Sequence, residues 1–244
     1  RDHYEGTELD WSNEFGAGPF NSPYRWSPLT FTVDSVEYCN ERPISTQQTG
    51  FSFVSQSRAW LPNEIGGVLW FGVADAAQSV YYPVYVGNTT VPESMKVGNG
   101  DLLNFTWDSS FWIHNWVSNM VYSRYSDKIV HVNELQDKLE SSFEKQQPEI
   151  EKQALALYKE SKPEAIKFLN NYTNTSVEQG LSEWKKLGEY LMVKYIDGVV
   201  KKESNGEFMR NEHGEPASPD RPGYPNEHYR KVIEETGDKY KVLF

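Results

Sequence analysis

The sequence is poor in cysteine, in clustered positive charge and in long apolar runs. Cys39 is the only cysteine among 244 residues, which excludes an internal disulfide and a metal site built on several thiolates. The formal net charge is −11, and no more than two Lys or Arg residues stand together. A nucleic-acid backbone or an anionic membrane surface is therefore an unfavourable partner. No run of about 18 apolar residues occurs, so we expect no membrane-spanning helix.

Motifs for self-contained catalysis are also missing. No Gly-x-Ser-x-Gly nucleophile elbow occurs, and Gly98-Asn99-Gly100 is too short to cradle a phosphate. Cys39 precedes Asn40-Glu41, an acidic setting that disfavours a thiolate. His131 and Glu134 lie three residues apart and could form half a metal site, although a solvated helix face explains them better. We therefore expect no metal and no cofactor.

The composition still supports a folded core, because 38% of the residues are hydrophobic and 14% are aromatic. Residues 1–30 are aromatic but irregular, which indicates a segment laid over a protein surface. Alternation or continuous apolar runs predict strands at 29–33, 51–58, 68–73 and 79–86, arranged as a meander. The first strand should bury one face and the third should be covered on both. Pro83 places the fourth strand at an edge or a bulge.

From about residue 108 the apolar period changes to that of helices, with Asp108 or Ser109 available as N-cap. Stripes predict helices at 108–122 and 130–146, a third beginning at Pro148, a fourth at Pro163 and a fifth over 174–195. Beyond residue 198 the chain is polar and proline-rich, with a closing helix at 226–236. Strands followed by helices indicate an α+β fold, divided into regions 1–107, 108–197 and 198–244.

Arg58 is the most interesting polar residue because it closes a predicted strand. A guanidinium is a fixed bidentate donor that suits a carboxylate or an oxyanion. Pairing with a structural glutamate is the competing interpretation, and the same alternative applies to Arg42 and Asp75. From the residues alone, the chain is an α+β domain without a self-sufficient active site.

Several separated motifs then resemble the dipeptidase family typified by dipeptidase A of lactic-acid bacteria, including its longer Bacteroides-type members. The resemblance covers about residues 1–195 and much of the tail. The motifs that carry it are the opening Arg-Asp-His-Tyr-Glu-Gly-Thr, Gly18-Pro-Phe with Pro23-Tyr-Arg-Trp26, Arg42-Pro-Ile-Ser-Thr-Gln-Gln-Thr-Gly-Phe-Ser-Phe-Val-Ser-Gln-Ser-Arg58, Trp60-Leu-Pro62, Ile65-Gly-Gly-Val-Leu-Trp-Phe-Gly72 and Tyr82-Pro-Val-Tyr85.

The resemblance implies an N-terminal-nucleophile cysteine hydrolase with a four-layer αββα sandwich that hydrolyses dipeptides. In such enzymes the α-amino group of the leading cysteine is the base, since an α-amine titrates near neutral pH. This chain begins with Arg1 and its only thiol is internal. We therefore expect the C-terminal portion of a longer dipeptidase, inactive by itself, with the N-terminal half as its partner. Arg58 is the candidate for the family's arginine near the nucleophile, and Arg42 is its rival.

The resemblance further implies an exported, periplasmic enzyme, with a cytoplasmic location as the alternative. Half of a sandwich should leave apolar sheet surface uncovered, which predicts dimerisation or an exposed apolar patch.

Two other functions stay open at this point. Trp112 and Trp116 could stack ligands in a peptide- or carbohydrate-binding module, although their helical spacing favours core packing. The chain could also be a structural partner that docks on another polypeptide.

Overall fold

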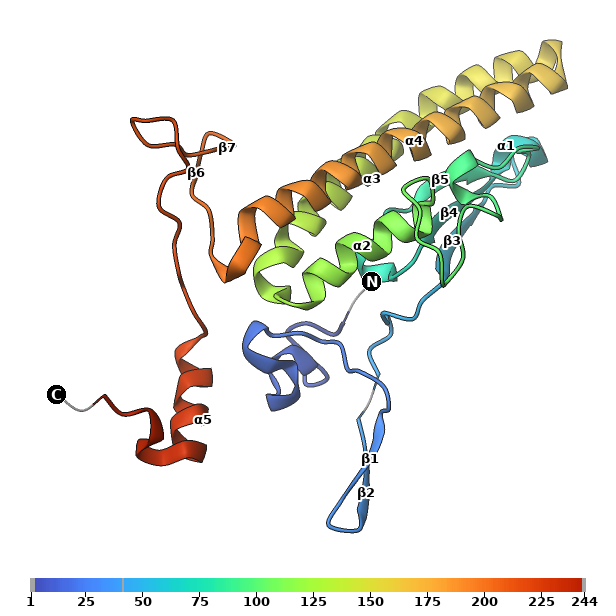
Figure 1. The fold of residues 1–244 in the computed structure, drawn as a ribbon. Helices are drawn as coiled ribbons and strands as arrows, with labels where there is room; N and C mark the ends of the chain where they lie inside the picture. Colours follow the sequence, from blue (N-terminus) through green and yellow to red (C-terminus); the bar gives the residue numbers. More distant parts are fainter. Residues whose placement is uncertain (1–2, 41, 243–244) are drawn as a thin grey trace.

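A computed structural model describes residues 3–40 and 42–242; Arg1, Asp2 and Glu41 from the motifs above lie outside the described residues. Its centre is an antiparallel sheet in the order β3-β4-β5, made of β3 (Phe51–Ser57), β4 (Gly67–Val73) and β5 (Tyr82–Tyr85). The helices α2 (Ser110–Tyr122), α3 (Tyr125–Glu160) and α4 (Lys162–Tyr195) pack together on one side of this sheet (Figure 1). The predicted α+β class is confirmed. The remaining elements are η1 (Trp11–Asn13), η2 (Phe15–Phe20), β1 (Thr30–Val33), β2 (Val36–Cys39), α1 (Asn63–Gly66), η3 (Ala76–Gln78), η4 (Glu93–Met95), η5 (Ile196–Gly198), β6 (Glu203–Ser204), β7 (Glu207–Phe208), α5 (Asn226–Thr236) and η6 (Gly237–Tyr240).

The first predicted strand exists, but it does not join the sheet. It forms β1 of a separate β1–β2 hairpin that projects from the body (Figure 1). All eight strand residues are exposed, so the expected buried face was wrong, and the return strand β2 was missed. Asp34 and Ser35 turn the hairpin with φ of 50° and 66°, the positive values that a tight hairpin turn needs. Phe31 and Tyr38 stack on each other, with ring centroids 5.8 Å apart, instead of entering the core.

The other three predicted strands form the sheet. Pro83 lies in β5, at one edge, as predicted. The expectation that both faces of β4 are covered was wrong in part, because Val68 and Gly72 are buried while Leu69 and Phe71 are half-buried. The helices cover only the face that carries Val68.

The helical region begins as predicted, since the Ser109 side chain accepts a hydrogen bond of 3.5 Å from the Trp112 N–H. The predicted break at Pro148 was wrong, because α3 runs unbroken through it. Pro148 lies on the exposed side of α3, where the carbonyl that it leaves without a helix partner faces water. The predicted fourth and fifth helices are one helix, α4, with Pro163 in its first turn.

Glycines on α4 allow the helices to approach the sheet closely. A Cβ atom at Gly180 would collide with the Tyr82 ring, and one at Gly188 would collide with the Trp116 ring. The Tyr82 ring is fully buried in the main hydrophobic core together with Trp184, and the Trp116 ring packs against that core. Small residues at these two positions therefore set the distance between α4 and its neighbours.

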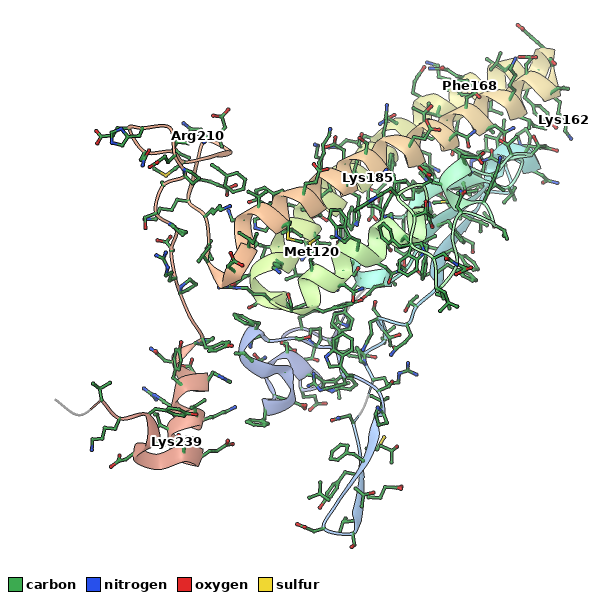
Figure 2. The ribbon with its side chains drawn as sticks, in the orientation of Figure 1. Met120, Lys162, Phe168, Lys185, Arg210 and Lys239 are labelled. Atoms are coloured by element: carbon green, nitrogen blue, oxygen red, sulfur yellow. The ribbon has the colours of Figure 1, made fainter. Side chains whose placement is uncertain are left out.

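The predicted closing helix is confirmed as α5, at the end of a long tail. Figure 2, in which Arg210 and Lys239 mark this tail, shows the chain extending away from the helical body. The tail still contacts α4 at its start, where Glu203 pairs with Lys194 and Phe208 stacks on Tyr190. No residue described between 192 and 242 is buried. None of the described helices combines the length and apolar character that crossing a bilayer requires. The three predicted regions stay a prediction.

Candidate functional site

The most concentrated polar cluster surrounds Asp75, directly after β4. Ala74 holds a left-handed conformation with φ of 65°, which turns the chain so that the Asp75 side chain is fully buried. Such a backbone is costly for a residue with a Cβ atom, and surrounding contacts must hold it in place. The Asp75 carboxylate provides these contacts. It caps η3 by accepting a hydrogen bond of 3.0 Å from the Ala77 N–H.

Three side chains donate to this carboxylate. The Ser45 hydroxyl donates to Oδ1, the Tyr122 hydroxyl donates to Oδ2 at 2.8 Å, and the Gln78 amide approaches Oδ2 at 3.5 Å. The same amide donates to the Tyr24 hydroxyl at 3.0 Å. Among the ion pairs of residues 3–40 and 42–242, none includes Asp75. Neutral donors therefore satisfy a fully buried acidic group.

The electrostatics keep the surrounding phenols protonated. Burial, reinforced by the Asp75 charge, raises the pKa of Tyr122 and of Tyr24 far above that of free tyrosine. A phenol that stays protonated remains a hydrogen-bond donor at every physiological pH. The network is consequently a fixed set of donors, not a proton-transfer relay.

The network also anchors residues 42–50, the segment that enters β3. Besides the Ser45–Asp75 bond, the Gln47 side chain donates to the Arg25 carbonyl at 2.7 Å. At the end of the segment, the Ala74 N–H donates to the Gly50 carbonyl at 2.9 Å. Arg42 is exposed at the beginning of this anchored segment, and among the described residues its guanidinium donates to the Gln48 amide oxygen at 3.3 Å. Its guanidinium retains donors that could bind a ligand.

Arg58 has a different environment. Its guanidinium forms an ion pair with Glu151 on α3, and the two side chains are only 10% and 12% exposed. Two further donors reach the carbonyls of Gly66, at 3.2 Å, and Ile65, at 3.1 Å. The Tyr85 hydroxyl also donates to Glu151, at 3.3 Å. Arg58 thus points into the helix layer and ties α3 to the sheet.

The remaining predicted candidates lie apart from one another. Cys39 is exposed at the end of β2. The His131 Nε2 atom lies 3.0 Å from the Tyr195 hydroxyl, and Glu134 is 3.8 Å from the other ring nitrogen. Burial, and then the charge of Lys194, lower the His131 pKa. Within the described part of the chain, no three His, Cys, Asp or Glu side chains gather as a metal site would require.

The two tryptophans considered as a ligand platform are both engaged. Trp116 packs against the core beside Gly188 and meets the Trp107 ring edge-on, with centroids 4.9 Å apart. The Trp112 indole donates to the Asp101 carbonyl at 3.0 Å. These contacts are those of packed side chains. A pocket of about 480 Å³ opens instead beside the Asp75 network, with Tyr24, Trp26, Asn40 and Tyr122 among its lining residues.

The face of the sheet opposite the helices is apolar and uncovered. Cross-strand register places Phe53 opposite Phe71, and Phe51 stacks on Phe71 with ring centroids 5.6 Å apart. Phe51 and Phe53 are 60% and 53% exposed. The apolar patch expected from the sequence is therefore present on β3.

Sequence reasoning singled out Asp75 but not its partners. Ser45, Gln78, Tyr24 and Tyr122 come from four separate segments, and no spacing along the chain relates them. The available signal was Asp75 itself, an acidic residue between two apolar strands. A carboxylate in that setting needs hydrogen-bond donors from elsewhere in the fold.

A comparison with protein-family models covers this region of the chain. Residues 1–138, more than half of the chain, match the family model described as peptidase family C69. The match includes the sheet, the whole Asp75 network and both candidate arginines. No curated protein matches the chain.

Proposed function

Because the chain belongs to peptidase family C69, we propose that it is the scaffold and pocket-forming part of a cysteine dipeptidase. The uncovered apolar face of β3 and β4 carries this proposal, since a sheet in water needs a second layer on such a face. In the proposal, a second sheet covers Phe51, Phe53 and Phe71 and completes an αββα sandwich. That sheet belongs to polypeptide outside these 244 residues and carries the nucleophilic cysteine.

The described residues supply binding and positioning in this proposal, not bond cleavage. The nucleophile is a thiolate, and the only thiol of this chain, Cys39, is exposed on a projecting hairpin. The cysteine of the second sheet would attack the peptide carbonyl with its own α-amine as base. The walls beside the Asp75 network, including Tyr24, Trp26 and Tyr122, would hold the dipeptide.

Of the two arginines, the geometry favours Arg42 as the residue that meets the substrate. Every dipeptide ends in a carboxylate, and a guanidinium with unused donors binds that group with two parallel hydrogen bonds. Arg42 retains such donors, and the Asp75 network fixes the segment that carries it. Arg58, the first candidate from the sequence, uses its donors on Glu151 and two carbonyls. We propose that Arg58 acts indirectly, by holding α3 against the sheet.

Dipeptide hydrolysis by the natural polypeptide that contains these residues tests the proposal. We expect Arg42→Ala to raise KM for dipeptides by at least about tenfold, the loss of one charge-assisted contact. Arg58→Ala should lower thermal stability, while its folded fraction keeps the parental KM. The 244 residues alone should release no amino acids from Ala-Ala. Release that disappears in Cys39→Ser would contradict the proposal, as would unchanged KM in Arg42→Ala.

A further inference from the structure

The outer edge of β3 is open. Among residues 3–40 and 42–242, the sheet order β3-β4-β5 pairs β3 with β4 alone. The other edge is protected, because β5 contains Pro83 and its carbonyl accepts a hydrogen bond of 2.8 Å from Thr173 on α4. Proteins usually protect exposed edges with charge, proline or a bulge. The β3 sequence, Phe-Ser-Phe-Val-Ser-Gln-Ser, has no charged residue and no proline.

The hydrogen bonds at both ends of β3 show which backbone groups face outward. The Arg58 N–H donates to the Gly66 carbonyl, and the Ala74 N–H donates to the Gly50 carbonyl. When the β3–β4 register is continued by one residue at each end, Arg58 lies opposite Gly66 and Gly50 lies opposite Ala74, so both are hydrogen-bonded pairs. Hydrogen-bonding residues alternate along an antiparallel strand. Even-numbered residues therefore bond to β4, and Phe51, Phe53, Ser55 and Ser57 direct their backbone groups to the open edge.

We propose that β3 pairs antiparallel with β3 of a second copy of this chain, about a two-fold axis at Val54. Phe51 then faces Ser57 of the other copy and Phe53 faces Ser55, and each of these pairs exchanges two backbone hydrogen bonds. Val54 lies opposite itself in a non-hydrogen-bonded pair. Such an isologous interface is closed, so it yields a dimer in which the two sheets are continuous.

The side chains fit this arrangement. Every phenylalanine meets a serine across the edge, so large groups face small ones on one side of the sheet. On the other side, the uncharged Gln147 of α3 lies over β3 and its amide donates to Gln56 at 2.8 Å.

Charge favours a second copy as the occupant. Two chains that each carry a net charge of −11 repel one another over most of their surfaces, but β3 itself contains no charged side chain. A strongly charged partner strand would find no opposite charge there. The edge is also distinct from the apolar face discussed above, so strand pairing leaves that face available.

The mass of the purified chain over a wide concentration range tests the proposal. We expect a concentration-dependent change from one chain to two. Val54→Lys places two like charges on the axis and should raise the dimer Kd by about tenfold or more. Val36→Lys is the matched control, since Val36 lies on the projecting hairpin and is 51% exposed, against 56% for Val54. A monomer at every concentration, or a dimer that Val54→Lys leaves intact, would overturn the proposal.

Disulfide trapping gives a second readout that does not depend on dimer affinity. In a Cys39→Ser background, Val54→Cys should form a covalent dimer on mild oxidation, because non-hydrogen-bonded pairs bring Cα atoms to about 4.5 Å, within disulfide range. Val36→Cys in the same background should stay largely monomeric. Equal trapping of the two variants would refute the register. Neither readout involves peptide hydrolysis, so the result is separate from that of the proposed function.

Discussion

The buried histidine of α2 predicts a specific loss of stability in acid. His114 is fully buried, and its ring stacks on Trp184 with centroids 5.0 Å apart. Its Nδ1 atom lies 2.8 Å from the Ser110 carbonyl oxygen, which can only accept, so Nδ1 carries the proton. Burial lowers the pKa of His114 to about 4. The imidazole is therefore neutral in the folded chain at pH 7.

The direction and size of the effect follow from the two pKa values. In the unfolded chain the histidine pKa returns to about 6.5. Between about pH 6.5 and pH 4 the unfolded state binds more protons than the folded state, so stability falls as the pH falls. The pKa difference of about 2.5 units, at about 1.36 kcal/mol per unit, corresponds to a loss of about 3 kcal/mol by pH 4.

Urea unfolding followed by tryptophan fluorescence, repeated from pH 7 to pH 4, measures this loss. His114→Asn is the informative variant, because its amide can still donate to the Ser110 carbonyl but cannot titrate. It should be less stable at pH 7, yet lose about 3 kcal/mol less than the parent on acidification. His213→Asn changes an exposed histidine with a side chain 73% accessible and should keep the parental pH dependence. Equal acid sensitivity of parent and His114→Asn would refute the reasoning.

Three further substitutions test the packing of the helices, all by urea unfolding at pH 7. Gly180→Ala forces a Cβ atom into the Tyr82 ring and should cost about 1–3 kcal/mol. Glu151→Gln leaves the Arg58 guanidinium buried without its countercharge and should cost about 3 kcal/mol. Ser109→Ala removes the α2 cap and should cost about 1 kcal/mol.

Each of these substitutions has a matched control. Gly50→Ala adds a Cβ atom where nothing lies within 4 Å. Glu149→Gln breaks an exposed pair with Lys152 that solvent screens, so it should cost little. Ser161 precedes α4 but forms no cap hydrogen bond, so Ser161→Ala should cost little. If a control substitution destabilises the chain as much as the substitution it is matched to, the structural explanation for the latter is wrong.

Local signals in the sequence predicted the three strands of the sheet and the start of α2, but they did not predict where α3 and α4 begin and end. Asp108 or Ser109 was predicted as the cap of α2, and Pro83 was predicted at an edge or a bulge, because each property depends on one residue and its neighbours. The structure places the cap at Ser109 and Pro83 in an edge strand. Pro148 was read as a helix start for the same local reason. Whether a proline breaks a helix also depends on packing along the rest of that helix, and α3 is held by contacts on both sides of Pro148.

The candidate site was less accessible from the sequence than the fold. The Asp75 network includes Gln78 three residues further along the chain, but Ser45, Tyr24 and Tyr122 reach it only through the tertiary fold. For the arginines, residue type indicated a carboxylate partner but not which carboxylate. Arg58 forms an ion pair with Glu151, which lies 93 positions away along the chain. No periodicity in the sequence reports on a pair separated by that distance.

The strands show the same limit in a form that bears on function. Alternation determines which residues share a face, but it does not determine what covers that face. In β3 the alternating phenylalanines were predicted correctly as a strand, yet they are more than half exposed. The uncharged sequence of β3 leaves both its face and its edge without the usual protection against association. Because a face and an edge need different partners, a second sheet and a second copy of the chain can bind β3 simultaneously.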